Sequence, residues 1–298
     1  MNSSVQLESL SNRIGISTNL FLEEEKVDEL VRYLANKFPI VEVEIEGVVR
    51  TQSDECRNLD MARTLRKISE ETGSIINIHA PYIRVDYILG SEDERTRARE
   101  VITHSAEFAI CAGANTMTFH PGFRFPKNSP TEMRGQALAL IQELAYDLFH
   151  INKHKGANLT YCLENSGNER PFLTLTHDEN EDIFSTSPLS LTLDIAHAAS
   201  YCSTMEQARE EVKRFARYAA NVHLSDIKFP KHLHLPLGQG SLNYHDMVMA
   251  IEETGYSGSY IVEEIGAGYK GEDYINAALG YREDLRAGRF SYLPTNSD

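Results

Sequence analysis

The chain has 298 residues, with 44 acidic and 29 basic side chains, so its formal net charge is −15. This balance disfavours nucleic acid and anionic membranes as partners, because both are bound through clustered Lys and Arg side chains. The hydrophobic content of 41% suffices for a large core, yet no apolar run approaches the roughly 18 residues of a membrane span.

Apolar runs rich in β-prone residues alternate along the chain with longer segments of helical periodicity. The predicted strands are residues 13–19, 40–46, 74–79, 115–120, 158–164, 189–194, 219–224 and 259–264. The predicted helices are residues 24–37, 57–72, 91–113, 130–155, 204–217, 243–254 and 271–287, with at most one short helix in residues 168–186. Eight strands alternating with helices predict a closed (β/α)8 TIM barrel rather than an open doubly wound sheet.

No linker rich in Pro, Gly or Ser divides the chain. We therefore expect a single TIM-barrel domain over residues 1–298, with a core at about residues 13–287 and short flexible termini. The amino-terminal stretch lacks the basic start and apolar centre of a secretory signal, and the four cysteines show no CxxC spacing. The expected location is the cytoplasm.

Six predicted strands end in a metal-seeking side chain. The segments are INIHAPY with His79, MTFHPG with His120, YCLENSG with Glu164, LTLDIAHA with Asp194 and His197, NVHLSDIK with His223, and YIVEEI with Glu263. A further segment, KHLHLPLGQG, adds His232 and His234 from a predicted loop. Because TIM-barrel active sites form at the carboxyl ends of the strands, we expect these side chains to converge on one or more divalent cations.

The central group of candidate ligands ends four successive strands and offers three carboxylates and one imidazole to a cation. It consists of Glu164, Asp194, His223 and Glu263. A single carboxylate at a strand end often only caps the next helix, but four in succession favour a metal site.

The other candidates each have a structural alternative. His79, His120, His197, His232 and His234 are further candidate ligands. The alternatives are proline-shaped turns after the first two, a buried hydrogen-bonded imidazole for the third, and an exposed loop for the last two. Candidate substrate-binding residues are Tyr82, His197, Asp226 and Lys228. For Tyr82 the alternative is simple packing, and for the Asp226 and Lys228 pair it is a surface salt bridge.

With these motifs assembled, the chain resembles the xylose isomerase-like barrel superfamily, which includes sugar isomerases, epimerases and endonuclease IV. The resemblance covers about residues 13–287. For the isomerase and epimerase branch it implies one Mn, Mg or Co ion held by the central group. It also implies catalytic roles for Glu164 and Glu263, which would exchange a proton next to the sugar carbonyl while the metal stabilises an enediolate.

For the endonuclease IV branch, the resemblance implies nine ligands that hold three zinc ions and cleave a phosphodiester. Eight positions match by residue type, namely His79, His120, Glu164, Asp194, His197, His223, His234 and Glu263. The ninth position is an aspartate in that family and is His232 in this chain. The segment after the second strand also lacks the longer DNA-contacting insertion of that family.

The sequence thus favours a divalent-metal-dependent isomerase or epimerase of a small sugar, sugar phosphate or related polyhydroxy carbonyl compound. The alternative is a zinc-dependent phosphodiesterase, an abasic-site endonuclease of the endonuclease IV type. A keto-polyol dehydratase and a non-catalytic binding barrel rank below both. The expected cofactor is Mn, Co, Mg or Zn, with one ion favoured and two or three left open. The expected partner is a small molecule, phosphorylated or not, with no membrane association, and homo-oligomer formation is left open.

Overall fold

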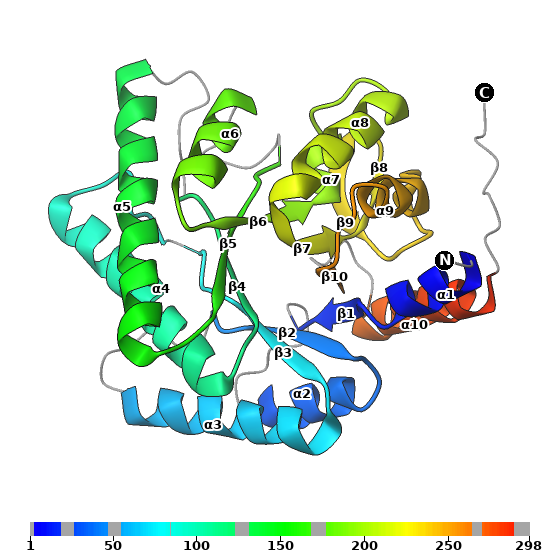
Figure 1. The fold of residues 1–298 in the computed structure, drawn as a ribbon, viewed down its shortest axis with the longest axis horizontal. Coiled ribbons are helices and arrows are strands. Elements are labelled where there is room, and N and C mark those ends of the chain that lie inside the picture. Colours follow the sequence, from blue (N-terminus) through cyan, green and yellow to red (C-terminus); the bar gives the residue numbers. More distant parts are fainter. Residues whose placement is uncertain are drawn as a thin grey trace.

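The computed structural model describes residues 3–18, 27–46, 55–83, 85–122, 131–167, 177–263 and 270–288. Eight parallel strands close into a barrel in the order β1-β10-β7-β6-β5-β4-β3-β2 (Figure 1). The strands are β1 (Ile14–Ser17), β2 (Ile40–Glu44), β3 (Ile75–His79), β4 (Thr116–Phe119), β5 (Thr160–Glu164), β6 (Ser190–Asp194), β7 (Ala219–Leu224) and β10 (Ser259–Val262). The predicted TIM-barrel fold is confirmed.

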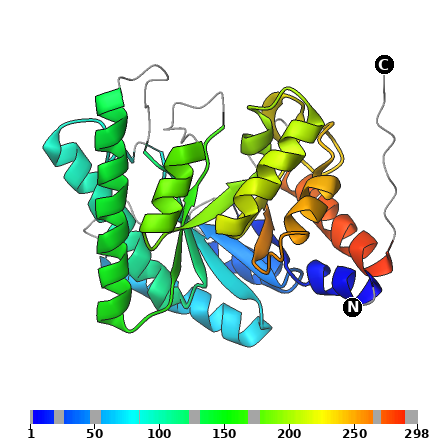
Figure 2. The ribbon, with the colours of Figure 1, turned by 45° about the horizontal axis from the view of Figure 1, so that its top comes forward.

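Helices surround the barrel on its outer side (Figure 2). They are α1 (Ser3–Ser11), α2 (Val27–Ala35), α3 (Glu55–Thr72), α4 (Glu92–Ala112), α5 (Thr131–Lys155), α6 (His177–Thr186), α7 (Ile195–Ala199), α8 (Met205–Phe215), the 3₁₀ helix η4 (Ala216–Tyr218), α9 (Tyr244–Glu252) and α10 (Gly271–Ala287). In the described parts of the chain, none of the helices has the length and apolar character needed to cross a lipid bilayer.

Local sequence signals fix where the helices begin and end, as α4 illustrates. Ser91 caps its first turn by accepting a hydrogen bond from the Glu94 backbone N–H, and the Glu94 carboxylate accepts one from the Ser91 N–H in return. The helix ends at Gly113, whose φ of 73° lies in the left-handed region that favours glycine.

Successive side chains of a barrel strand point alternately into the lumen and outward, and this alternation separates polar from apolar side chains. On β2, Glu42 accepts a 2.8 Å hydrogen bond from Asn221 on β7, a strand that is not its neighbour in the sheet. This contact must cross the lumen, so Glu42 faces inward. Val41 and Val43 are fully buried on the opposite face of the strand. Apolar packing therefore lies outside the barrel wall, and polar groups are collected inside it.

Three segments differ from the prediction. One is the short helix α7 (Ile195–Ala199), which lies in none of the predicted helices. Residues 3–11, expected in a flexible terminus, form α1 beside α10 (Figure 1), where Leu10 is buried and the guanidinium of Arg282 donates to the Ser11 carbonyl. The segment predicted as a loop around His232 and His234 is instead an antiparallel hairpin of β8 (Asp226–Lys228) and β9 (Lys231–Leu235). The carboxyl-terminal tail from residue 289 lies outside the described residues.

Candidate metal centre

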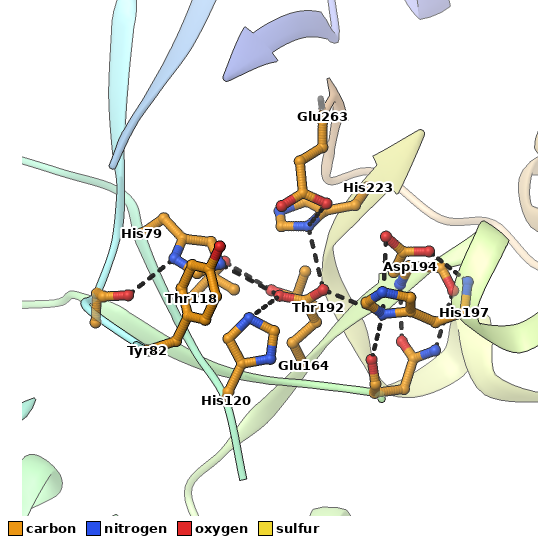
Figure 3. Close-up of polar contacts among 12 residues, drawn as sticks. His79, Tyr82, Thr118, His120, Glu164, Thr192, Asp194, His197, His223 and Glu263 are labelled. Atoms are coloured by element: carbon orange, nitrogen blue, oxygen red, sulfur yellow. Dashed lines mark hydrogen bonds and ion pairs between the residues drawn. The ribbon is translucent and has the colours of Figure 1, made fainter. Parts of the chain in front are cut away.

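Eight of the nine predicted ligand residues lie together at the carboxyl end of the barrel. Figure 3 shows all of them except His234. Those at strand ends are His79 (β3), His120 (after β4), Glu164 (β5), Asp194 (β6), His223 (β7) and Glu263 (after β10). His197 on α7 and His234 on β9 complete the set. All eight side chains are buried. The predicted convergence of distant segments on one rim is therefore confirmed, whereas the backbone of His232 lies on β9 and its side chain is outside the described part.

The central group has its ligand atoms within 4.8 Å of one another, and its members are Glu164, Asp194, His223 and Glu263. The Nδ1 atom of His223 lies 3.2 Å from Glu263 Oε2 and 3.6 Å from Glu164 Oε1. Within the described chain, the atoms without a hydrogen-bond partner include Glu164 Oε1, Asp194 Oδ2, His223 Nδ1 and Glu263 Oε2. Buried polar atoms are normally satisfied, and three adjacent carboxylates repel one another. The donor set therefore fits a divalent cation.

Two flanking groups share residues with the central group and meet the same 4.8 Å criterion. One is His79, His120 and Glu164, and the other is Asp194, His197 and His234. The Nε2 atoms of His79 and His120 lie 3.3 Å and 3.4 Å from Glu164 Oε2. Figure 3 shows Glu164 at the centre, with the two imidazoles on one side and His197 on the other. Glu164 and Asp194 each belong to two of the three groups.

Asn165, which the sequence analysis did not single out, orients two of the ligands. Its side chain accepts a 2.7 Å hydrogen bond from the Asp194 backbone N–H and donates a 3.0 Å bond to the Asp194 carbonyl. Its own carbonyl lies 2.7 Å from His197 Nδ1. Asp194 Oδ1 meanwhile accepts from the His197 N–H and caps α7. Asp194 thus caps a helix with one oxygen and presents the other to the central group.

The carboxylates of the centre control the protonation of its histidines. Burial lowers the pKa of His79, but the hydrogen bond to Glu164 and the charges of Glu44, Glu164 and Glu42 outweigh it and raise the pKa to about 10. The surrounding carboxylates likewise hold the pKa of His223 well above its ordinary value, against the effect of burial. In the metal-free centre, the protonated imidazoles of His79 and His223 therefore offset the negative charge of the carboxylates.

In four further candidate ligands, either burial or neighbouring charge determines the direction of the pKa shift. Burial lowers the pKa of His120 to about 3 and raises the pKa of Asp194 to about 7. Burial also disfavours the charged forms of Glu164 and Glu263, but the nearby imidazoles keep both pKa values below their ordinary range. The two glutamates are therefore ionised at neutral pH.

Three glutamates on β2 or just after it also belong to this region, although none of them was a predicted site residue. Glu42 Oε1 lies 2.8 Å from His223 Nε2. Glu44 is 2% exposed, and burial, opposed by His79 and reinforced by other carboxylates, raises its pKa to about 8. Glu46 accepts hydrogen bonds from the Tyr82 and Ile83 N–H groups. The signal in the sequence is IVEVEIE, which places glutamates on one face of an otherwise apolar strand.

The predicted substrate contacts occupy different environments. Tyr82 is half-buried at the rim, with its ring centroid 5.7 Å from that of His79 and 4.9 Å from that of His120. His197 lies inside the centre, as described above. Lys228 is exposed on β8. The Asp226 carboxylate accepts four backbone hydrogen bonds, from Ile227, Gly238, Gly240 and Leu242. Asp226 therefore shapes the loop after β9, which follows the strand that carries His234.

Comparison with known proteins gives the same architecture. A family model described as "Xylose isomerase-like TIM barrel" matches residues 35–289. Among curated proteins, Uncharacterized protein MJ1311 of Methanocaldococcus jannaschii is 24% identical over 259 residues, which cover 85% of this chain and 84% of that protein.

Solved structures also share the fold. A D-tagatose 3-epimerase-like protein has a TM-score of 0.72 at 19% identity, covering 94% of this chain and all of the other. The 3-keto-D-glucoside 4-epimerase YcjR of E. coli has a TM-score of 0.69 at 16% identity, covering 91% and 99% of the two chains. At these identities the likeness establishes the barrel fold alone.

Proposed function

Because the chain belongs to the xylose isomerase-like TIM barrel family, we propose that it is a divalent-metal-dependent isomerase or epimerase. Its substrate would be a small sugar, sugar phosphate or related polyhydroxy carbonyl compound. The observation that carries the proposal is that two buried glutamates, Glu164 and Glu263, flank His223 in a single four-residue ligand group. Proton transfer next to a carbonyl uses such a pair of carboxylates beside a cation.

The chain's own residues would divide the reaction between them. When bound, the cation would polarise the substrate carbonyl and stabilise the enediolate. Glu164 and Glu263 have lowered pKa values, so each is ionised and able to accept a proton. Their strands β5 and β10 are separated by β6 and β7 in the barrel, so the carboxylates approach from different sides. One would remove the proton next to the carbonyl and the other would return one, while Tyr82 at the rim packs against the substrate.

The proposed substrate class covers sugars with and without a phosphate group. The assays therefore include matched ketoses of both kinds.

The second candidate is the zinc-dependent phosphodiesterase, and the three overlapping ligand groups favour it. Three dications would make the centre strongly positive, which suits phosphate and hydroxide. The overall charge of −15 disfavours a DNA substrate. A keto-polyol dehydratase would use the same residues as the isomerase. The cytoplasmic location and homo-oligomer formation remain predictions.

The test combines metal analysis with substitution of the two glutamates. We expect about one Mn, Mg or Co ion per chain and turnover of a ketose. Glu164→Gln and Glu263→Gln should each abolish exchange of the substrate hydrogen with deuterated solvent. Glu210→Gln, on the exposed surface of α8, is the matched control and should retain activity. Two or three zinc ions per chain, together with nicking of abasic duplex DNA, would overturn the proposal in favour of the phosphodiesterase.

A further inference from the structure

The two ring nitrogens of His223 face different surroundings. Nδ1 faces the central ligand group, 3.2 Å from Glu263 Oε2. Nε2 faces the other way, 2.8 Å from Glu42 Oε1. Both His223 and Glu42 are completely buried. Glu42 belongs to none of the three ligand groups, so its carboxylate lies behind the imidazole rather than beside the cation position.

Glu42 is itself held from the far side. Its second oxygen accepts a 2.8 Å hydrogen bond from the side-chain amide of Asn221, two residues before His223 on β7. The side-chain amide oxygen of Asn221 in turn accepts a 2.6 Å hydrogen bond from the Ser259 hydroxyl on β10. Both carboxylate oxygens of Glu42 thus act as acceptors, and three strands fix their position. Such a satisfied buried network permits little rotation of its members.

We propose that Glu42 is a positioning residue that fixes which nitrogen of His223 binds the cation. It accepts the Nε2–H hydrogen and leaves the Nδ1 lone pair directed at Glu164 and Glu263. The inference rests on the proposed function only in requiring a divalent cation in the central group. A carboxylate behind a metal-binding imidazole fixes its tautomer and orientation, and its loss typically weakens metal binding about 10- to 100-fold.

The experiment measures cation binding rather than turnover. Chelator-stripped wild-type protein and the Glu42→Leu and Glu42→Gln variants are titrated with Co²⁺, which reports affinity and ligand geometry through its absorption spectrum. We expect Glu42→Leu to bind about 10- to 100-fold more weakly with an altered spectrum. Glu42→Gln retains one acceptor oxygen and should lose less.

The matched control is Tyr161→Phe. It removes another hydrogen bond made by a buried side chain of a barrel strand, the 3.0 Å contact from the Tyr161 hydroxyl to the Asn152 side chain, which involves no member of the Glu42 network. We expect its Co²⁺ affinity and spectrum to match those of the wild type. An equal loss of affinity in this control would mean that general loosening of the barrel explains the effect, which overturns the proposal.

Nitrogen-resolved NMR of the zinc-loaded protein supplies a readout that a merely structural role would not change. In the wild type, the His223 spectrum should show zinc on Nδ1 and hydrogen on Nε2, and in Glu42→Leu this pattern should be lost. If Glu42→Leu does not fold, Glu42→Asp, which withdraws the carboxylate by one methylene, replaces it with the same expectation.

The outcomes separate this proposal from the proposed function. Wild-type affinity, spectrum and ring pattern in Glu42→Leu, or in its replacement Glu42→Asp, would overturn the positioning role. A wild-type protein that binds no divalent cation would overturn both proposals. Cation binding that depends on Glu42, in a protein inactive on every sugar tested, would leave the positioning role standing and refute only the isomerase.

Discussion

Replacing Glu44 by glutamine should change how the stability of the metal-free protein depends on pH. Glu44 ends β2 opposite His79 on β3, and its Oε2 atom has no hydrogen-bond partner among the described residues. Burial raises its pKa from the ordinary 4.5 to about 8. Between these values the folded protein keeps the proton that the unfolded chain has released. The free energy of unfolding must therefore fall as the pH rises across this range.

The size of the effect follows from the two pKa values of Glu44. Each pH unit between 4.5 and about 8 costs 1.36 kcal/mol at most, so the full loss approaches about 5 kcal/mol. Glutamine stays neutral at every pH and does not incur this loss. The Glu44→Gln variant should therefore gain stability relative to the wild type from pH 5 upward, and the gain should level off above pH 8.

Urea unfolding of chelator-treated proteins at one-unit steps from pH 5 to pH 9 measures this difference. Subtracting the wild-type curve removes the contribution of groups that titrate in the same way in both proteins. Glu210→Gln on the exposed surface of α8 is the control for an acid-to-amide change away from the barrel interior. A constant difference between Glu44→Gln and the wild type would refute the reasoning, because Glu44 would then ionise like an exposed carboxyl.

Two further predictions concern metal binding and the loop after β9. The raised pKa values of His79 and His223 mean that cation binding at pH 7 must displace protons, so affinity should rise with pH, up to about tenfold per unit for each proton. Calorimetry in buffers of different ionisation enthalpy counts these protons, and zero release would contradict the charge balance. Gly240→Ala should be strongly destabilising, because a Cβ there would lie 2.2 Å from Asp226 Oδ1. In Gly280→Ala, the control within α10, a Cβ meets nothing within 4 Å, and thermal unfolding should show up to about 1 kcal/mol of stabilisation.

The barrel could be predicted because its strands carry a strong local signal. Strands buried on both sides are short apolar runs, and each predicted run coincides with an observed strand to within two residues at either end. The hairpin of β8 and β9 was missed because KHLHLPL alternates histidine with leucine beside two prolines, which also describes a loop. The first helix was missed because few apolar residues mark SSVQLESLS.

The candidate ligands could be predicted because their residue types and their positions at strand ends both indicate a metal site. One carboxylate at a strand end often only caps the next helix, but histidines and carboxylates that end several successive parallel strands are carried to a common rim. Glu42 and Glu44 could not be assigned in this way. Glutamates alternating with valines also fit a strand with one solvated face, and only closure of the barrel turns that face into a buried lumen. Asn165 contacts the Asp194 backbone through its side-chain amide, but an asparagine after a strand is also common in ordinary turns, so its residue type gives no specific signal.

The charge of the barrel interior explains why the number of bound cations would distinguish the proposed isomerase from the phosphodiesterase. Within the described residues, the one buried Lys or Arg is Arg282, which bonds backbone carbonyls of Ser11 and Lys37 away from the centre. The countercharge for the central carboxylates must therefore come from protonated histidines or from metal. One dication among three carboxylates leaves the centre with a net charge of about −1. This charge suits a neutral sugar that binds through its oxygens. Under the proposal, each further cation in a flanking group would add two positive charges and make the same rim an anion site, so the measured metal stoichiometry would indicate which substrate class the barrel binds.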